Sequence, residues 1–362
     1  MKAELGHQTM KAFMPRIEIA LSQIQHNARM LCNLYGKQGI ALMGVSKAVL
    51  GEPLIAQAMI QGGVKFIADS RLENIQRMKV AGISTQFVLL RTPLSQAESI
   101  VEDVNISLNT EIETIEKLNY YASLHNKIHQ IILMVEMGDL REGILPCDIS
   151  PLINKVLSLS HIKIAGLGCN LACYGGIKPD NQKMLQLSAL TEAMEHEFQI
   201  NLPLVSGGNS ANYEWYKSSN NIGRINNLRL GESILLGCET VNGQRIPNLQ
   251  TNAFKLIAEV IESKLKPSLP FGEIGRDAFG NIPVFQDRGI HQRAIIALGK
   301  QDTLISGLST SQDLEILGSS SDHLVIDSKN TSLKIGEGVN FNLDYGSLLA
   351  AMTSPLIKKQ FI

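Results

Sequence analysis

The sequence has no long hydrophobic run and no excess of charge of either sign. No stretch approaches the roughly 18 apolar residues that a membrane-spanning helix needs, and residues 1–16 lack the apolar centre of a secretory signal. The formal net charge of the 362 residues is −1, which gives no electrostatic reason to expect nucleic acid or a membrane surface as a partner. These absences favour an ordinary soluble globular protein.

Cysteine is scarce and scattered. The five cysteines are Cys32, Cys147, Cys169, Cys173 and Cys238. An odd, dispersed set argues against a disulfide framework and favours a reducing, cytoplasmic location. Cys169 and Cys173 lie close in sequence, but no second Cys or His pair accompanies them at metal spacing. Two packed thiols are therefore favoured over a zinc site, and we expect no metal.

A glycine-rich dinucleotide turn is also missing, which counts against a doubly wound open sheet. Short apolar runs alternate instead with amphipathic stretches of helical period, such as 69–82, 109–124 and 181–198. The runs are 40–46, 64–69, 86–91, 104–109, 130–137, 162–170, 202–208 and 225–231. This alternation of strands and helices predicts a (β/α)8 TIM barrel of the α/β class.

The pattern changes after about residue 240, where Pro and Gly become more frequent and helical patterns stop. We therefore predict a barrel over residues 22–240 and a C-terminal all-β domain over residues 241–362. Residues 1–21 are expected to form a lead-in that ends in the strand RIEIAL and pairs with the C-terminal β domain.

Lys47 closes the first apolar run of the predicted barrel, in the segment GVSKAVLG. Active sites of TIM barrels lie at the C-terminal ends of the strands. A lysine at the mouth of a dry barrel can have its pKa lowered and can then attack an aldehyde as an amine nucleophile. The alternative is an ordinary solvated lysine.

Two glycine-containing turns follow the last two predicted strands. SGGNSANY, residues 206–213, places backbone N–H groups and a hydroxyl at a helix start, which suits an anion, although a plain capped turn has the same pattern. LRLGES, residues 228–233, adds a second turn where barrel phosphate sites often lie. An aldehyde-reactive lysine beside a phosphate cradle suggests pyridoxal 5'-phosphate as the cofactor.

The sequence resembles the alanine-racemase-like, fold-type III pyridoxal-phosphate enzymes, and among them most closely those that racemise ornithine. GDLREG, SGGNS and SSDHLVID are specific together, and the likeness begins at RIEIALSQIQHNARML and covers nearly the whole chain. It implies an amino-acid racemase, an isomerase that inverts Cα through an aldimine and a carbanion. The resemblance also implies a homodimer with a shared active site. An alanine racemase, a decarboxylase of the same fold and a non-catalytic cofactor-binding protein are the alternatives.

The resemblance assigns the cofactor contacts. Lys47 matches the lysine that binds the cofactor and serves as one catalytic base, and Arg141 matches an arginine near the cofactor phenolate and the substrate carboxylate. Asn170 falls where the racemases place a histidine against the cofactor ring. The matches to the phosphate site are Gly208, Ser210, Gly231, Glu232 and, from the C-terminal domain, Tyr345.

Arg229 matches the arginine that faces the pyridine nitrogen of the cofactor. A guanidinium only donates hydrogen bonds, because its pKa lies above about 12. The ring nitrogen then stays unprotonated and withdraws electrons less strongly, which favours proton exchange at Cα over decarboxylation. The alternative is an arginine that forms a salt bridge at a helix start.

The sequence departs from the alanine racemases at three positions. Lys300 replaces the tyrosine that serves as the base on the opposite face, so we expect Lys300 to take this role, with Asp302, Asp322 and His323 as further candidates. An exposed loop lysine is the alternative. Gly51 replaces a phosphate-binding tyrosine, and Met134 replaces a lysine that supports the arginine.

A basic amino acid is the expected substrate, ornithine before lysine, and its distal ammonium needs an acidic partner. The candidates are Asp277, Asp302 and Asp322, any of which is equally suited to a turn. Asp322 matches an acidic residue that the partner subunit's C-terminal domain contributes.

Overall fold

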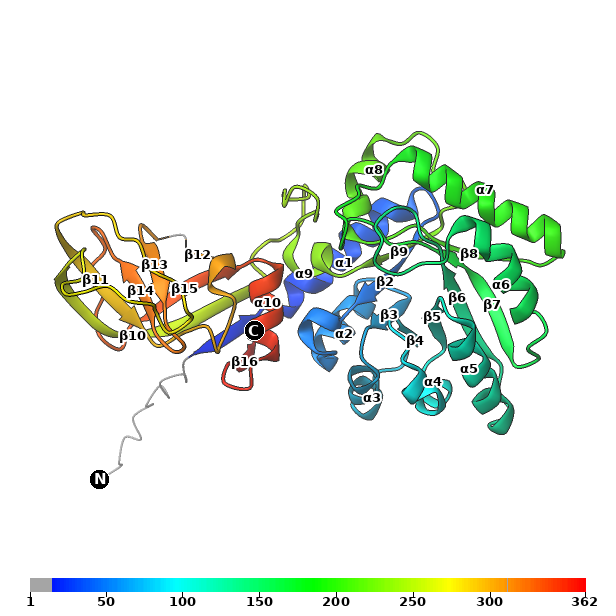
Figure 1. The fold of residues 1–362 in the computed structure, drawn as a ribbon, viewed down its shortest axis with the longest axis horizontal. Coiled ribbons are helices and arrows are strands. Elements are labelled where there is room, and N and C mark those ends of the chain that lie inside the picture. Colours follow the sequence, from blue (N-terminus) through cyan, green and yellow to red (C-terminus); the bar gives the residue numbers. More distant parts are fainter. Residues whose placement is uncertain (1–14, 311) are drawn as a thin grey trace, which may run out of the picture. The chain divides into compact units, whose positions relative to one another are not determined.

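The computed structural model describes residues 15–310 and 312–362, so most of the predicted lead-in lies outside the described residues. The chain folds as two compact units (Figure 1). The barrel unit comprises Ala20–Ala253, and the β unit comprises Phe254–Ile362 together with the strand Arg16–Ile19.

The barrel unit is a closed barrel of parallel strands in sequence order, with the last strand hydrogen-bonded to the first. The strands are β2 (Ala41–Val45), β3 (Phe66–Asp69), β4 (Gln86–Leu89), β5 (Ile106–Asn109), β6 (His129–Met134), β7 (Ile162–Gly168), β8 (Leu204–Ser206) and β9 (Asn227–Leu230). Each overlaps one of the apolar runs, and the predicted TIM barrel is confirmed.

Helices follow the strands and surround the barrel (Figure 1). They are α1 (Leu21–Gly36), α2 (Pro53–Gln61), α3 (Leu72–Val80), α4 (Ala97–Asp103), α5 (Ile112–Leu124), α6 (Ile149–Val156), α7 (Asn181–Phe198), α8 (Tyr213–Ser218) and α9 (Glu232–Leu236), with 3-10 turns η1 (Lys47–Val49), η2 (Leu94–Gln96), η3 (Pro146–Asp148) and η4 (Ser210–Asn212). In α3, Leu72, Ile75 and Met78 are buried at helical spacing. The Asp180 side chain caps α7 by accepting a hydrogen bond from the backbone N–H of Lys183 at 2.8 Å.

The inside of the barrel is filled by side chains, as is usual for this fold. The buried cluster consists of Met43, Val45, Ala68, Val88, Ile106, Leu108, Ile132, Met134 and Ala165. Met134 therefore packs in the core, where a lysine would need a partner for its charge. With the interior closed, polar chemistry is confined to the ends of the strands.

The β unit is built on one mixed sheet. Its strands are β1 (Arg16–Ile19), β10 (Phe254–Pro267), β11 (Ile290–Ile296), β12 (Leu308–Ser309), β13 (Glu315–Ser319), β14 (Leu324–Asp327), β15 (Gly338–Leu343) and β16 (Lys358–Phe361). The order is β12-β15-β10-β11-β14-β13, and β1 pairs antiparallel with β10 and parallel with β16. The 3-10 turn η5 (Ile305–Gly307) precedes β12.

One helix, α10 (Tyr345–Thr353), interrupts the β unit where the sequence pattern indicated only strands. Asp344 begins it by accepting a hydrogen bond from the backbone N–H of Ser347 at 2.7 Å. Leu348, Ala351 and Met352 then bury one face. The helix is short and has Gly346 in its first turn. Its helical spacing of apolar residues is therefore hard to recognise among the neighbouring strand patterns.

Residues 241–253 fold with the barrel unit, although the change in composition begins before them. The amide of Asn27 in α1 donates to the carbonyl oxygens of Ile234 at 3.0 Å and Gln250 at 2.8 Å, and it accepts from the N–H of Gln250 at 2.7 Å. These bonds hold the segment against α1, so the unit ends at Ala253 and not near residue 240.

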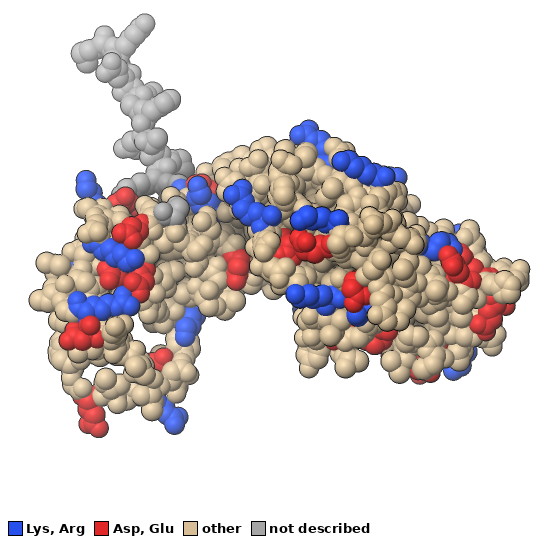
Figure 2. Space-filling model, turned by 90° about the horizontal axis from the view of Figure 1, so that it is seen from above, with Lys and Arg blue, Asp and Glu red and all other residues tan. Residues whose placement is uncertain are grey.

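Surface charges of both signs are interspersed on the face shown in Figure 2. This mixture agrees with the net charge of −1 and gives that face no extended region of one sign. Within residues 15–310 and 312–362, no helix combines the length and the apolar character that crossing a membrane requires.

Candidate active site

Lys47 lies at the C-terminal end of β2, in the turn η1, and its side chain is partly buried. Burial is the largest cause of the lowered pKa of its ammonium group. Cys173 and Asp69 act to raise this pKa. The guanidinium groups of Arg141 and Arg229 act to lower it. The predicted lysine and the two predicted arginines, which come from three different strand ends, are therefore close enough to influence one another.

Asp69 fixes the turn that carries Lys47. Its buried carboxylate accepts hydrogen bonds from the Ser46 hydroxyl at 2.7 Å, the Asn74 amide at 3.0 Å and the backbone N–H of Arg71 at 2.9 Å. Burial raises the pKa of Asp69, and these donors act to lower it. Sequence reasoning missed this role of Asp69. The signal was available, because an acidic residue at the end of an apolar strand is buried and needs hydrogen-bond donors.

Gly51 closes the same turn in a left-handed conformation, with φ of +58°. A Cβ atom at this position would lie 2.7 Å from Cβ and 2.9 Å from the carbonyl oxygen of Asn74. The space beside the backbone of Gly51 is thus occupied by the residue that binds Asp69. A tyrosine, as in the alanine racemases, has no room here with this backbone.

Gly51→Ala should therefore lower the free energy of unfolding more than the same change at Gly39. Gly39 has φ of +77°, and no atom lies within 4 Å of the position that a Cβ would take, so alanine there costs only the left-handed strain, about 1–2 kcal/mol. At Gly51 the overlap with Asn74 adds about 1–3 kcal/mol. Urea unfolding of both variants measures the difference, and equal losses would contradict the steric account.

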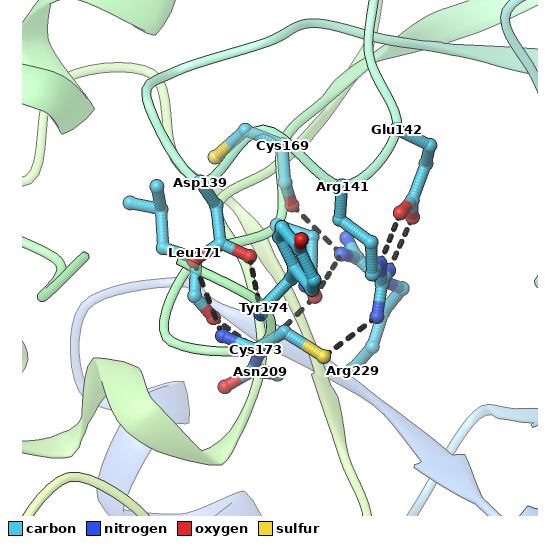
Figure 3. A network of polar contacts seen from close by, with 10 residues as sticks. Asp139, Arg141, Glu142, Cys169, Leu171, Cys173, Tyr174, Asn209 and Arg229 are labelled. Atoms are coloured by element: carbon cyan, nitrogen blue, oxygen red, sulfur yellow. Dashed lines mark hydrogen bonds and ion pairs between the residues drawn. The ribbon is translucent and has the colours of Figure 1, made fainter. Parts of the chain in front are cut away.

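Arg229 in β9 is buried and crosses the mouth of the barrel towards β8 and β7. It donates to the carbonyl oxygen of Cys169 at 2.7 Å (Figure 3). It also donates to the Ser206 hydroxyl at 2.6 Å and to Oδ1 of Asn170 at 3.5 Å. Ser206 in turn donates to Asn227 at 2.6 Å. Burial lowers the pKa of Arg229 to about 10, so the group is still a cation and a donor at neutral pH.

Asn170 follows β7 and is oriented by its neighbours. Its Oδ1 accepts a hydrogen bond from Nδ2 of Asn209 at 3.0 Å, and the same nitrogen of Asn209 donates to the carbonyl oxygen of Leu171 at 2.9 Å. Within the described residues, Nδ2 of Asn170 is buried and has no hydrogen-bond partner. A buried donor without a partner is costly and suits an acceptor on a ligand.

The two predicted phosphate turns meet through serine side chains. The hydroxyls of Ser210 and Ser233 lie 3.1 Å apart, and the Ser210 oxygen also accepts from the backbone N–H of Ser233 at 3.1 Å. Gly208 has φ of +141°, and a Cβ there would lie 2.2 Å from Oδ1 of Asn212. Gly231 begins the neighbouring turn, α9, whose first residue is Glu232. The turn η4 and the helix α9 thus start side by side, with the hydroxyls of Ser210 and Ser233 in contact.

Arg141 lies in the loop after β6 and is held between two side chains (Figure 3). Its Nε and Nη2 donate to the two carboxylate oxygens of Glu142, and its Nη1 donates to Sγ of Cys173 at 2.7 Å. The bond to Glu142 and its charge raise the pKa of Arg141. Arg141 therefore has partners of its own in place of the lysine that Met134 replaces.

Asp139 ties the loop after β6 to the loop after β7. Its carboxylate accepts from the backbone N–H groups of Cys173 at 3.2 Å and Tyr174 at 2.9 Å (Figure 3). It also accepts from the backbone N–H of Ile177 at 3.4 Å. Burial acts to raise the pKa of Asp139, but these donors lower it overall. This clamp keeps Cys173 beside Arg141.

Comparison with known proteins places the chain in a family. The family model for the N-terminal domain of alanine racemase matches residues 19–238. The chain belongs to the alanine racemase family. It is 41% identical to an ornithine racemase of Acetoanaerobium sticklandii over 353 residues, which are 96% of this chain and 99% of that protein. It is 37% identical to a lysine racemase of Thermotoga maritima over 352 residues, which are 96% of this chain and 98% of that protein.

The fold of this alanine racemase family member also matches solved structures. An alanine racemase from Bartonella henselae with covalently bound pyridoxal phosphate superposes with a TM-score of 0.74 at 19% identity. The match covers 97% of this chain and 100% of that one. It extends over both units and supports the architecture of the whole chain.

The β unit of this family member gathers the remaining predicted residues on neighbouring loops. The backbone N–H of Lys300 donates to Ser320 at 3.1 Å, and its ammonium lies 3.3 Å from the centre of the Phe279 ring. Asp302 accepts from the N–H of Gly299 at 2.8 Å, and burial raises its pKa.

The other acidic candidates of the β unit are engaged locally. Asp322 shares a hydrogen bond of 2.7 Å with His323, which is the largest cause of its lowered pKa. Asp277 closes a turn by accepting from the N–H groups of Phe279 at 2.9 Å and Asn281 at 2.8 Å. Tyr345 begins α10. The site residues thus form two groups, one in each unit.

Proposed function

We propose that this protein is a pyridoxal 5'-phosphate-dependent amino-acid racemase that acts on a basic amino acid, ornithine before lysine. The curated relatives that match almost its whole length are racemases of these two amino acids. The observation that carries the proposal is Lys47 itself, a partly buried amine of lowered pKa that shares the barrel mouth with Arg141 and Arg229.

The barrel residues fit the cofactor on four counts. Lys47 offers an amine that is more readily neutral than an ordinary lysine, and Arg229 offers a buried cation. Ser210 offers a buried hydroxyl among closely packed turns. Asn170 offers a hydrogen-bond donor that has no partner among the described residues. We assign Gly208, Ser210, Gly231, Glu232 and Tyr345 to the phosphate. The cofactor, when bound, withdraws electrons from Cα of an amino acid and so acidifies its hydrogen.

Each barrel residue then has a distinct role. Lys47 takes or returns the Cα proton on one face, because its lowered pKa keeps a larger fraction of the amine neutral. Arg141 holds the substrate carboxylate. Arg229 donates a hydrogen bond and, with a pKa of about 10, keeps its own proton at neutral pH. This arrangement supports proton exchange at Cα over decarboxylation.

Inversion needs a second proton carrier on the opposite face, for which we propose Lys300, with Asp302 and Asp322 as alternatives. The three lie on neighbouring loops of the β unit. We further propose a two-fold homodimer in which the β unit of the partner supplies this group, since two-fold dimers are the commonest oligomers. A cytoplasmic location is supported by the five cysteines, which are all free.

Lys300→Ala should lower the rate of racemisation by about 10²–10⁴, the usual contribution of a general acid–base group. The absorbance of the bound cofactor should not change, because Lys47 is intact. Lys264→Ala is the control, since Lys264 is an exposed lysine of the same unit paired with Glu262. An unchanged rate in Lys300→Ala would reassign the base to Asp302 or Asp322.

The function is tested with single enantiomers of ornithine, lysine and alanine, whose optical rotation is followed with time. A racemase drives ornithine and lysine to zero rotation from either side. A decarboxylase would release carbon dioxide, and a non-catalytic protein would leave the rotation constant. Uptake of solvent deuterium at Cα without loss of rotation would indicate proton exchange on one face only.

A further inference from the structure

The edge of the Arg141 guanidinium that is formed by Nε and Nη2 is fully engaged. Glu142 takes Nε and Nη2 together, and Cys173 takes Nη1 at 2.7 Å. A substrate carboxylate that binds the Nε–Nη2 edge with both oxygens must displace Glu142. The two-oxygen geometry of the Glu142 carboxylate is the geometry that an amino-acid carboxylate would adopt on the same edge.

Four carboxylates lie at the ends of β3 and β6, and they differ in their hydrogen bonds. Asp69 and Asp139 each accept from several donors of the protein, and Glu136 accepts from the N–H of Gly138 at 2.5 Å. Glu142 is bound to Arg141, and its side chain is 33% exposed. Of these four, Glu142 is the one whose partner is a side-chain cation, so a ligand carboxylate that competes for Arg141 releases it.

We propose that Glu142 binds the distal ammonium of the basic amino-acid substrate after the substrate carboxylate has replaced it on Arg141. This inference rests on the proposed function and names the residue that selects the substrate class. Arg141 exchanges the Glu142 carboxylate for the substrate carboxylate, so it loses little interaction free energy. Glu142 loses its cation and regains one only when the substrate carries a second ammonium group.

The surrounding contacts allow this exchange without disturbing the site. Arg141 keeps its bond to Cys173, which Asp139 holds through the backbone of the next loop. Glu142 follows Arg141 directly in the chain, so both ends of one small molecule are bound by neighbouring residues. An amino acid with a neutral side chain would leave the Glu142 carboxylate partly desolvated and without a cation, which is unfavourable.

The test compares ornithine with 2-aminopentanoic acid, which has the same carbon chain without the distal ammonium. Glu142→Gln keeps the shape of the side chain and removes its charge. The ratio of kcat/KM for ornithine to that for 2-aminopentanoic acid should fall by about 10- to 100-fold, the value of a hydrogen bond between charged groups. The fall should lie mainly in KM for ornithine. Calorimetric titration should show the same change in relative affinity.

Glu98→Gln and Glu102→Gln are the matched controls, because they remove the same charge from exposed side chains of α4 that have no assigned role. Their ratio should stay that of the unmodified protein. Glu142→Leu should repeat the result of Glu142→Gln, and both should unfold at the normal temperature since the residue is partly exposed. A ratio that is unchanged in both Glu142 variants, or that falls in either control, overturns the inference. An unmodified protein that does not racemise ornithine would refute the proposed function itself.

Discussion

Lys47→Ala will abolish racemisation, with a loss of at least about 10⁴ in rate, because it removes the amine that we assign to the cofactor and to the proton on one face. Borohydride treatment followed by mass spectrometry should attach the cofactor covalently to the unmodified protein and not to the variant. Lys37→Ala, which changes an exposed lysine just after α1, is the control and should keep full activity. Covalent attachment in the alanine variant would transfer the role of Lys47 to another amine.

The same lysine should leave a signature in stability. Its pKa is lower in the folded than in the unfolded chain, so between these two pKa values the unfolded state binds more protons and stability rises as the pH increases. Lys47→Met should therefore be more stable than the unmodified protein at pH 7 in the absence of cofactor. The difference should shrink as the pH approaches the ordinary lysine pKa of about 10.4. An exposed lysine would produce no such trend.

The barrel could be predicted from the sequence because its signals are local and repeated. Each strand is a short apolar run, and the helices show apolar residues at helical spacing or a capping residue, as Asp180 does for α7 (Asn181–Phe198). The closed barrel then brings together strand ends that are far apart in the chain. This explains why Lys47, Arg141 and Arg229 could be selected from sequence and resemblance, and why the structure finds them within electrostatic reach.

The parts that sequence reasoning missed depend on how loops fold against each other. The bond between Arg141 and Cys173, and the clamp formed by Asp139, join two loops that no local pattern pairs. The overlap between Gly51 and Asn74 likewise depends on the backbone of two turns. Glu142 was present in the GDLREG motif, but only contact with Arg141 distinguishes it from an ordinary surface acid.

Arg229→Leu is expected to have the largest combined effect on stability and chemistry. The guanidinium holds the Ser206 hydroxyl and the carbonyl oxygen of Cys169, and its loss leaves these buried groups short of a donor. Each unsatisfied group costs about 1–3 kcal/mol, although relief of the buried charge offsets part of this. Thermal unfolding should therefore occur at a clearly lower temperature.

Arg224→Leu is the matched control for this prediction. Arg224 pairs with Glu195 at 2.7 Å through side chains that are both partly exposed, so its loss should cost no more than about 1 kcal/mol and leave activity intact. In Arg229→Leu, racemisation should also fall by at least about 10², since the site loses the donor that we assign to the cofactor ring. Formation of a 2-oxo acid from ornithine, measured beside racemisation, should rise relative to inversion. If the ratio of the two reactions stays constant while both decline with stability, Arg229 only supports the fold, and the assignment of this residue to the control of the reaction fails.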